Sequence, residues 1–280
     1  MRIVKTVAEM QSVCRNLRIR GSVLGFVPTM GALHEGHLSL VRRARSECDT
    51  VVVSIFVNPL QFAPGEDFAE YPRTFEEDCR LLKREKVDIL FAPEAVDMYP
   101  HGSVTTVTVS EVGDRLDGDS RPGHFTGVAT VVAKLLHVIG PTRAYFGQKD
   151  AAQLAVLRQM VRDLNFDVAL VGCAIVRDTD GLALSSRNKY LSAAEREQAL
   201  VINRTLLELE QMIIEGERQS ITLVGRGMET LDAAPGIQVD YLAIVDANTL
   251  LPVTSVETGA LVAVAAYVGK TRLIDNFLVA

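Results

Sequence analysis

The fold is decided by the stretch Pro28-Thr29-Met30-Gly31-Ala32-Leu33-His34-Glu35-Gly36-His37. An apolar run at residues 23–27 precedes it and predicts a buried strand. Residues 38–45 follow it and predict a helix, because their apolar positions recur at helical spacing. A strand that ends at a glycine-containing turn and continues into a helix is typical of α/β proteins. We therefore expect a parallel sheet whose strands are connected by helices.

The turn itself predicts a binding site for an anionic group. Backbone N–H groups at the start of a helix, together with the positive end of its dipole, bind phosphate. His34 and His37, in the first turn of the expected helix, would face the same anion. Imidazole N–H donors there can stabilise charge that develops on a phosphate during an in-line displacement. These features indicate a nucleotide site.

Metal binding and simple surface exposure are the alternative roles for the two histidines. A zinc site needs a third and usually a fourth ligand, whereas His101, His124 and His137 come without a cysteine or carboxylate cluster. The metalloprotease pattern needs histidines four residues apart on a helix with a Glu between them, and here the spacing is three. Ordinary surface histidines stay open as a second alternative. We expect no metal held by the protein itself.

Two common phosphate-binding motifs are absent from the sequence. It contains no Walker-type Gly-x-x-x-x-Gly-Lys-Ser/Thr loop, and no Gly-x-Gly-x-x-Gly turn follows the first expected strand. The His-x-Gly-His form after a parallel strand is instead similar to the signature of the nucleotidylyl-transferase superfamily, which includes class I aminoacyl-tRNA synthetases.

Composition and charge restrict the partners. With 48% hydrophobic and 23% charged residues, the 280-residue chain is expected to be globular and long enough for a full core. The net charge of −6 and the lack of any block of five or six cationic residues argue against a nucleic-acid partner. The densest basic cluster, residues 42–45, fits the solvated face of a helix better than a nucleic-acid contact.

Neither a membrane segment nor a signal peptide is predicted. Residues 1–5 lack the apolar core of a signal peptide, and the longest apolar stretch, residues 260–268, falls short of the roughly 18 residues of a membrane span. The cysteines form no Cys-x-x-Cys pair, as expected for free thiols in a reducing compartment. We therefore expect a cytoplasmic protein. The cysteines are Cys14, Cys48, Cys79 and Cys173.

Strands and helices are expected to alternate over residues 1–176, which predicts a Rossmann-type parallel sheet. Ligands of such sheets bind beyond the carboxyl ends of the strands, where the strand order switches. Three polar segments lie at strand ends, at residues 30–37, 58–62 and 147–150. The further strands are expected at residues 50–57, 87–91, 143–146 and 168–176, and the helices at 75–86, 126–139 and 151–164.

A smaller α+β domain, residues 177–280, is expected to follow as a lid. Residues 192–195 form a capping box that opens a helix to about residue 215. A second helix is expected at 221–231, and strands at 237–245 and 260–268. The hinge between the domains is expected near residues 177–187.

Three further segments add polar groups at the expected site. Residues 54–62 place the amides of Asn58 and Gln61 at a strand end, where they can bind a hydroxylated or carboxylated substrate or form a plain Asn-Pro turn. Residues 121–127 precede a helix and either position an anion or form a capped turn. Residues 183–188 bring hydroxyls and a guanidinium that suit a triphosphate. Taken singly each segment is weak, but their order and spacing are specific.

With these segments in place, the chain resembles the pantoate–β-alanine ligase family from its first strand to its C-terminus. The resemblance implies a Rossmann-type N-terminal domain, a smaller C-terminal domain and, commonly, a homodimer. It implies that pantoate attacks the α-phosphate of ATP to give pantoyl adenylate and pyrophosphate. β-Alanine then attacks this mixed anhydride and releases pantothenate and AMP. Mg²⁺ is expected to accompany ATP.

The resemblance also assigns site residues. His37, His34, Lys149 and Arg187 would be catalytic, with His37 as general acid or proton donor. Gln61, Gln153 and Asn58 would bind pantoate and β-alanine. Lys149 would contact the phosphates, Asp150 the ribose and Val176 the adenine edge. The residues implied around ATP are Met30, Gly31, Ala32, Leu33, His34, Glu35, Gly36, His37, Gly147, Gln148, Lys149, Asp150, Val176, Leu184, Ser185, Ser186 and Arg187.

Two other functional classes remain in view. A cytidylyl- or adenylyltransferase would attach a nucleotide to a phosphorylated acceptor and would form product without an amine. A non-catalytic RNA-binding relative of a tRNA synthetase would bind tRNA with steep salt dependence. The acidic net charge and the lack of an anticodon-reading domain argue against the second class.

Overall fold

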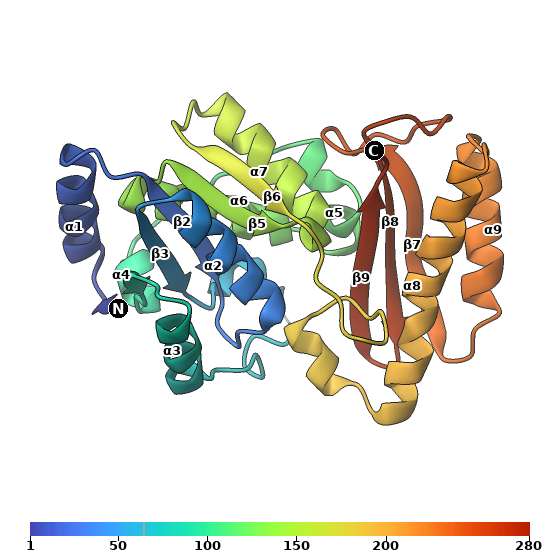
Figure 1. Cartoon of the computed structure of the whole chain (residues 1–280), viewed down its shortest axis with the longest axis horizontal. Helices are drawn as coiled ribbons and strands as arrows, with labels where there is room; N and C mark the ends of the chain where they lie inside the picture. The colour runs from blue at the N-terminus through green and yellow to red at the C-terminus, as the bar shows by residue number, and fades with distance from the viewer. Residues whose placement is uncertain (64) are drawn as a thin grey trace.

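The computed structural model describes residues 1–63 and 65–280 and contains two sheets. Figure 1 shows the smaller, antiparallel sheet between the N-terminal unit on one side and two long helices on the other. None of the helices in the described ranges is long and apolar enough to cross a membrane.

The N-terminal sheet has six strands, all paired in parallel, in the order β1-β4-β3-β2-β5-β6. Its order runs from β2 through β3 to β4 in one direction and from β2 through β5 to β6 in the other. The switch therefore lies between β2 and β5, where ligands of such sheets bind. The bounds are Arg2–Val4 (β1), Leu24–Thr29 (β2), Thr50–Ile55 (β3), Ile89–Phe91 (β4), Arg143–Gly147 (β5) and Ala169–Cys173 (β6).

Helices cover both faces of this sheet. Successive strand residues point to opposite faces, so Phe26 packs in one apolar cluster and Val27 in another. The cluster around Phe26 contains the helices α1 (Val7–Ile19), α6 (His124–Ile139) and α7 (Ala151–Asp163). The cluster around Val27 contains α2 (Glu35–Glu47) and α3 (Phe75–Arg84). The predicted Rossmann-type layering is confirmed.

The C-terminal sheet is antiparallel, in the order β7-β8-β9. Its strands are Ile237–Asp246, Ala260–Val268 and Thr271–Leu278, and its helices are α8 (Ala193–Ile214) and α9 (Ser220–Asp232). Strand β8 is buried on both faces. Val262 and Val264 pack in the cluster of α8 and α9, whereas Leu261 and Ala263 pack in the cluster of the N-terminal unit. This double burial accounts for the apolar run that forms β8.

Some boundaries differ from the sequence expectation. The strand expected at 168–176 ends at Cys173, which pairs with Gly147, the last residue of its partner β5. The strand expected at 50–57 ends at Ile55, which pairs with Thr29 at the end of β2. Helix α2 begins at Glu35 rather than at residue 38. The sequence patterns predicted no element at β1, α1, the short helix α4 (Ala95–Met98) or β9.

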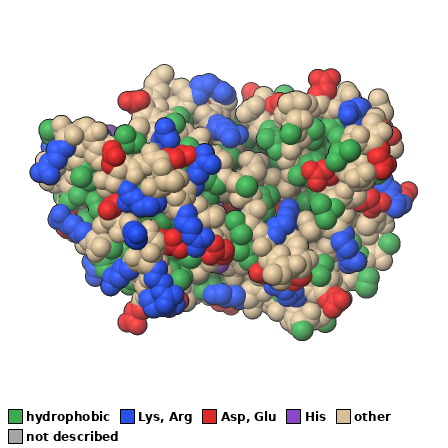
Figure 2. All heavy atoms as spheres, viewed as in Figure 1, with side chains coloured by type: hydrophobic (Ala, Val, Ile, Leu, Met, Phe, Trp, Pro, Cys, Tyr) green, Lys and Arg blue, Asp and Glu red, His purple; other side chains and the backbone are tan. Residues whose placement is uncertain are grey.

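Basic side chains on the surface are interspersed with acidic ones on the face that Figure 2 shows. The cluster at residues 42–45 follows this pattern, because each of its arginines pairs with a carboxylate. Arg42 contacts Glu35 and Glu85, while Arg43 pairs with Glu47 and Arg45 with Asp88. The cluster is the ion-paired outer face of α2.

Candidate active site

Two adjoining hollows lie at the switch point. The inner pocket, of about 250 Å³, extends from the end of β2 to the end of β5. The outer cleft, of about 1070 Å³, continues toward the C-terminal sheet. Seven residues line both hollows, so the two form one continuous site: Arg121, His124, Lys149, Asp150, Gln153, Ser185 and Arg187.

The histidine turn, residues 30–37, is held by a buried carboxylate. Gly31 and Ala32 have left-handed φ values of 83° and 50°. The Asp78 side chain accepts hydrogen bonds from the backbone N–H groups of Ala32 (3.0 Å) and Leu33 (2.9 Å). It also accepts one from the Thr74 hydroxyl (3.2 Å). Asp78 therefore compensates two buried donors in a backbone conformation that a non-glycine residue such as Ala32 seldom adopts.

Sequence reasoning did not identify Asp78. It lies in the first turn of α3, four residues before the buried Leu82 and next to Cys79. A carboxylate on the apolar stripe of a helix indicates a specific buried partner. That position was the signal in the sequence.

The two histidine rings pack closely, at a tilt of 39°, at the start of α2. His34 is the N-cap residue, and its ring centroid lies 4.1 Å from that of His37. The His34 ring lies over the backbone of Gly36, where an added Cβ would approach it to 2.9 Å. A side chain at position 36 would thus displace His34 from the pocket.

Both imidazoles are neutral at neutral pH in this arrangement. Burial, followed by the charge of Lys149, lowers the pKa of His34 to about 4. Burial, followed by the neighbouring His34 and Lys149, lowers the pKa of His37 to about 3. The backbone N–H of His34 donates to Nδ1 of His37 at 3.4 Å, which assigns the proton of the neutral His37 ring to Nε2. Nδ1 of His34 is buried and has no hydrogen-bond partner among the described residues.

The predicted substrate amides come from the 3-10 turn η1 (Pro59–Gln61). Asn58 is 1% exposed and donates to the carbonyl of Gly127 (3.0 Å) and to Oε1 of Gln61 (3.1 Å). Its Oδ1 accepts from the Tyr99 hydroxyl and from the backbone of Leu60. Asn58 thus lies behind Gln61 with its polar atoms already satisfied.

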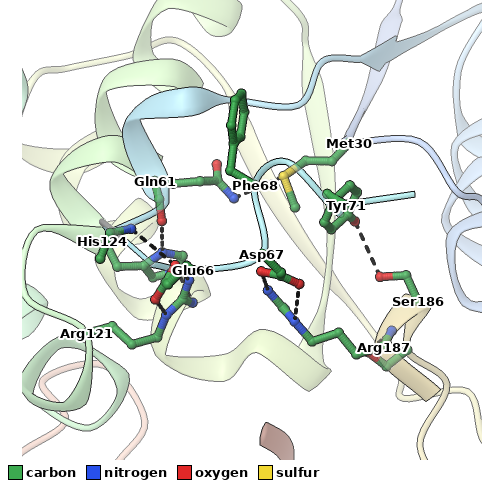
Figure 3. A network of polar contacts seen from close by, with 12 residues as sticks. Met30, Gln61, Glu66, Asp67, Phe68, Tyr71, Arg121, His124, Ser186 and Arg187 are labelled. Carbon is green, nitrogen blue, oxygen red and sulfur yellow. Dashed lines mark hydrogen bonds and ion pairs between the residues drawn. The ribbon is translucent and has the colours of Figure 1, made fainter. Parts of the chain in front are cut away.

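Helix α6 approaches η1 at a glycine. A Cβ added to Gly127 would lie 2.1 Å from the carbonyl oxygen of Leu60, so any side chain would push the turn away from the helix. The amide of Gln61 donates toward Sδ of Met30 at 3.1 Å, which connects η1 to the histidine turn. Figure 3 shows this contact above the arginines of the cleft.

Two arginines of the site are paired with carboxylates of one loop (Figure 3). Arg187 contacts Asp67 at 3.0 Å, and Arg121 contacts Glu66 at 2.7 Å. Burial raises the pKa of Glu66, but its bonds to Arg121 more than offset this, so the pKa lies below its usual value. Lys149 approaches Asp150 to 3.6 Å, a looser contact.

His124 connects Arg121 to the turn η1. Its Nδ1 lies 2.8 Å from the backbone carbonyl of Gln61, so this nitrogen carries the proton and donates. Its Nε2 accepts from Nη1 of Arg121 at 3.0 Å. Burial, followed by the charge of Arg121, lowers the pKa of His124 to about 4, so the ring is neutral.

The segment between the two sheets closes one side of the site. Leu184 donates its backbone N–H to the carbonyl of Val176 at 3.0 Å. The Ser185 hydroxyl caps η4 (Ser186–Tyr190) by accepting from the backbone of Arg187. Ser186 lies 3.4 Å from the Tyr71 hydroxyl. These contacts hold both serines at the rim of the inner pocket.

The C-terminal sheet contacts the loop after β5 directly. The Asn276 amide, on β9, donates to the carbonyls of Gln148 (3.1 Å) and Lys149 (2.9 Å). On the same strand Asp275, 4% exposed, accepts from Arg177 at 2.6 and 3.0 Å. Strand β9 therefore fixes the backbone that presents Lys149.

Most of the predicted site residues line the inner pocket. Those that line neither hollow are Gly31, Ala32, Leu33, Glu35 and Gln148. Gly31, Ala32 and Leu33 are buried residues of the turn itself, and Glu35 is exposed and bonded to Arg42. Besides Asp78, the assigned site residues lacked Tyr71 of the inner pocket and Glu66 and Asp67 of the outer cleft. Arg121 and His124 also line the inner pocket; residues 121–127 were expected at the site, but neither residue was assigned a role.

Comparison with known proteins gives the family of this chain. The sequence model of a family described as pantoate-beta-alanine ligase matches residues 2–278. The chain belongs to this family. The pantothenate synthetase of Koribacter versatilis is 57% identical over 278 residues, which cover 99% of this chain and 96% of that protein. That of Thermotoga neapolitana is 52% identical over 276 residues, 99% of each chain.

Solved structures of pantoate–β-alanine ligases share the fold. Pantothenate synthetase from Thermus thermophilus superposes with a TM-score of 0.94 at 50% identity, over 99% of each chain. The ligase from Francisella tularensis, complexed with "Beta-gamma ATP and Beta-alanine", gives a TM-score of 0.80 at 36% identity, over 99% of this chain and 97% of that one. The chain is therefore an ATP-using ligase of pantoate and β-alanine, which confirms the activity implied by the resemblance.

Proposed function

We propose that this ligase forms pantoyl adenylate and then pantothenate within the continuous site at the β2–β5 switch point. The observation that carries the proposal is the meeting of two sets of groups in one pocket. His34 and His37, of the histidine turn, and Lys149, after β5, line the inner pocket together with Gln61 and Gln153. Phosphate-binding and hydroxyl-binding groups in one pocket suit a reaction between ATP and a hydroxy acid.

In the first step a carboxylate oxygen of pantoate attacks the α-phosphorus of ATP. The new P–O bond forms as the bond to the bridging oxygen breaks and pyrophosphate leaves, so negative charge grows on the phosphate oxygens. Lys149 and Arg187 would stabilise this charge, and the neutral rings of His34 and His37 would donate N–H groups. A bound triphosphate raises the pKa of an adjacent imidazole, because an anion favours the imidazolium. His37 would then supply a proton to the leaving pyrophosphate.

In the second step the amine of β-alanine attacks the acyl carbon of the anhydride. An amide C–N bond forms as the nitrogen releases a proton, the acyl C–O bond breaks, and AMP leaves with the electron pair. ATP supplies the activation, so no nucleophilic side chain is needed. The acyl adenylate hydrolyses in water, which requires a covered site. We propose that the C-terminal unit, residues 177–280, is this cover, supported by the bonds from Asn276 to the loop after β5.

The division of labour follows from the surroundings of each group. Gln61 and Gln153 would bind the hydroxyl and carboxylate of pantoate, and Gln61 would also contact β-alanine. We assign Asn58 a positioning role through Gln61, because its amide is satisfied inside the protein. Asp150 would contact the ribose, and Val176 the adenine edge.

Mg²⁺ would enter with ATP. The described parts of the chain contain no group of three or more His, Cys, Asp or Glu side chains that could hold a metal ion. Mg²⁺ commonly keeps several waters and binds substrate phosphates with few protein ligands. The site suits an ion held mainly by the triphosphate. When bound, this ion would further stabilise the charge on the phosphates.

The enzyme is further proposed to be a cytoplasmic homodimer. The four cysteines are free, as expected in a reducing compartment.

The proposed dimer contact is the run at residues 103–109. It consists of valine and threonine after one serine, and it belongs to no strand in the structure as described. Val104 is 91% exposed within this run. An unpaired run of β-branched residues suits strand pairing with a second copy. Val104→Lys should shift the sedimenting species from dimer to monomer.

ATP–pyrophosphate exchange tests the proposed reaction. Exchange should require pantoate and fail with other hydroxy acids, and pantothenate should appear only after β-alanine is added. Product formation without an amine would instead indicate a nucleotidylyltransferase that acts on another acceptor. Exchange that is indifferent to pantoate would contradict the assignment of Gln61 and Gln153.

A further inference from the structure

The acidic loop, residues 65–70, places adjacent carboxylates on the two arginines of the site. Arg121 donates Nε to Glu66 at 2.9 Å and Nη2 to the same carboxylate at 2.7 Å. Arg187 donates Nε to Asp67 at 3.2 Å and Nη2 at 3.0 Å. Figure 3 shows the two pairs side by side. In both pairs the carboxylate takes the same two-pronged edge of the guanidinium.

That edge is the one an anionic ligand would use. A guanidinium binds carboxylate or phosphate best through two parallel N–H groups. In Arg121, Nη1 also donates to Nε2 of His124, so all three guanidinium nitrogens have a hydrogen-bond partner. In Arg187 the Nε–Nη2 edge is likewise filled by Asp67. A substrate anion can reach the Nε–Nη2 edge of either arginine only by displacing the loop carboxylate.

The acidic loop is held in place without these ion pairs. Arg73 donates to the carbonyls of Phe68 (3.1 Å) and Ala69 (3.2 Å), and its guanidinium lies over the Phe68 ring. The ring of Phe62 packs against those of Phe68 and Tyr71, with centroids 5.3 and 5.9 Å apart. Removing one carboxylate charge should therefore leave the loop folded.

The ion pairs are of moderate strength. The Arg187 and Asp67 side chains are 32% and 21% exposed, and Arg121 and Glu66 are 18% and 25% exposed. Pairs that are this accessible to water are partly screened and contribute little net stability. A triphosphate, with several charges and many acceptor oxygens, can outcompete a single carboxylate. A small anion carries less charge and has fewer acceptor oxygens.

We propose that Glu66 and Asp67 are resident counter-ions that occupy the arginine edges until substrate anions replace them. The inference rests on the proposed function, in which Arg187 binds the phosphates of ATP. The carboxylates would balance the charge of the two arginines in the ligand-free site. They would thus lower the affinity for every anion that must displace them, without touching the reacting atoms.

Asp67→Asn tests the proposal by titration calorimetry with α,β-methylene-ATP and, separately, with sulfate. The variant should bind both anions more tightly, by about twofold to fivefold, because no ion pair has to be broken first. Glu70→Gln is the matched control. This substitution removes the same single negative charge from the loop, but Glu70 is paired with no arginine in the described structure. Its affinities should stay at the wild-type values.

The Arg187→Gln background tests whether the effect passes through the arginine. There, Asp67→Asn should give no gain in affinity. Weaker or unchanged binding by Asp67→Asn in the otherwise wild-type protein would overturn the counter-ion role. If that variant were unfolded by circular dichroism, Asp67→Ser would replace it. Wild-type protein that failed to bind the ATP analogue would instead refute the proposed function, which keeps the two failures distinct.

Discussion

Asp78 accepts a hydrogen bond of 3.0 Å from the backbone N–H of Ala32 and so fixes the histidine turn from the neighbouring helix α3. Asp78→Asn should destabilise the protein by about 1–3 kcal/mol, since an amide NH₂ would face a buried N–H donor. Urea unfolding would measure this loss, and adenylation should fall with it because His34 and His37 lose their support. Glu76→Gln, an exposed change in the same helical turn, is the control. Equal stability of both variants would contradict this role.

The histidines themselves should act on chemistry rather than on folding. His34→Ala or His37→Ala should slow pantoate-dependent pyrophosphate exchange by about 10²–10³-fold, the usual effect of losing a transition-state donor. Far-UV circular dichroism should stay unchanged. His137→Ala, at an exposed position of α6, should leave exchange intact. Near-normal exchange by His37→Ala would show that the phosphates lie elsewhere.

Lys149 should separate the two half-reactions. An ammonium beside the phosphates matters while pyrophosphate is leaving and much less once the adenylate has formed. Lys149→Ala should therefore fail with ATP and pantoate but retain part of its turnover of supplied pantoyl adenylate. Rapid-quench assays of each half-reaction would measure the difference. Equal losses in both steps would indicate a structural role for Lys149.

Replacing Gln61 should weaken the binding of pantoate much more than the binding of ATP. Gln61→Ala removes a donor and an acceptor from the pocket, which usually costs about 1–3 kcal/mol, or roughly one to two decades in affinity. Titration with a non-hydrolysable ATP analogue and then with pantoate would separate the two ligands. A defect for ATP as large as that for pantoate would refute the division of labour between Gln61 and the nucleotide-binding groups.

Acid should destabilise the protein through the two histidines of the turn. The pKa values of His37 and His34 lie at about 3 and about 4, below the ordinary value of 6.5. The unfolded chain therefore binds protons that the folded chain does not, so this stability is full well above pH 6.5 and falls as the pH drops toward 4 for His34 and toward 3 for His37. Between pH 6.5 and 5 each such histidine contributes a slope of up to about 1.4 kcal/mol per pH unit. Urea unfolding of His37→Gln at several pH values should show a shallower slope than the wild type, and an identical slope would argue against a neutral buried His37.

Much of this architecture could be predicted from local patterns. The apolar run before Pro28 and the helical spacing after His37 specify a strand, a turn and a helix, and the same reasoning located the strand ends that form the site. Strand β9 was not predicted, because it contains Arg272, Asp275 and Asn276, and polar residues of these types usually lie on the surface. Two of these, Asp275 and Asn276, are buried, and both form hydrogen bonds with partners about 100 or more residues away in sequence.

The missed site residues share one physical cause. Asp78, Glu66 and Asp67 act through partners that only the folded chain brings near them, at sequence separations that no motif records. Strand β1 was missed for a different reason. Its three residues, Arg2–Val4, are too few to show a period, and the parallel pairing with β4 is what defines them as a strand.

Strand β8 belongs to two apolar cores, with Leu261 and Ala263 on the side of the N-terminal unit and Val262 and Val264 on the side of α8 and α9. The C-terminal unit is consequently not a cassette that can be exchanged freely between relatives. A chimera that takes this unit from another family member must also take the facing surface of the N-terminal unit, or it will join two halves whose side chains do not interlock. Substitutions on alternate residues of β8 are thus tied to different parts of the chain, and the strand should vary in step with both.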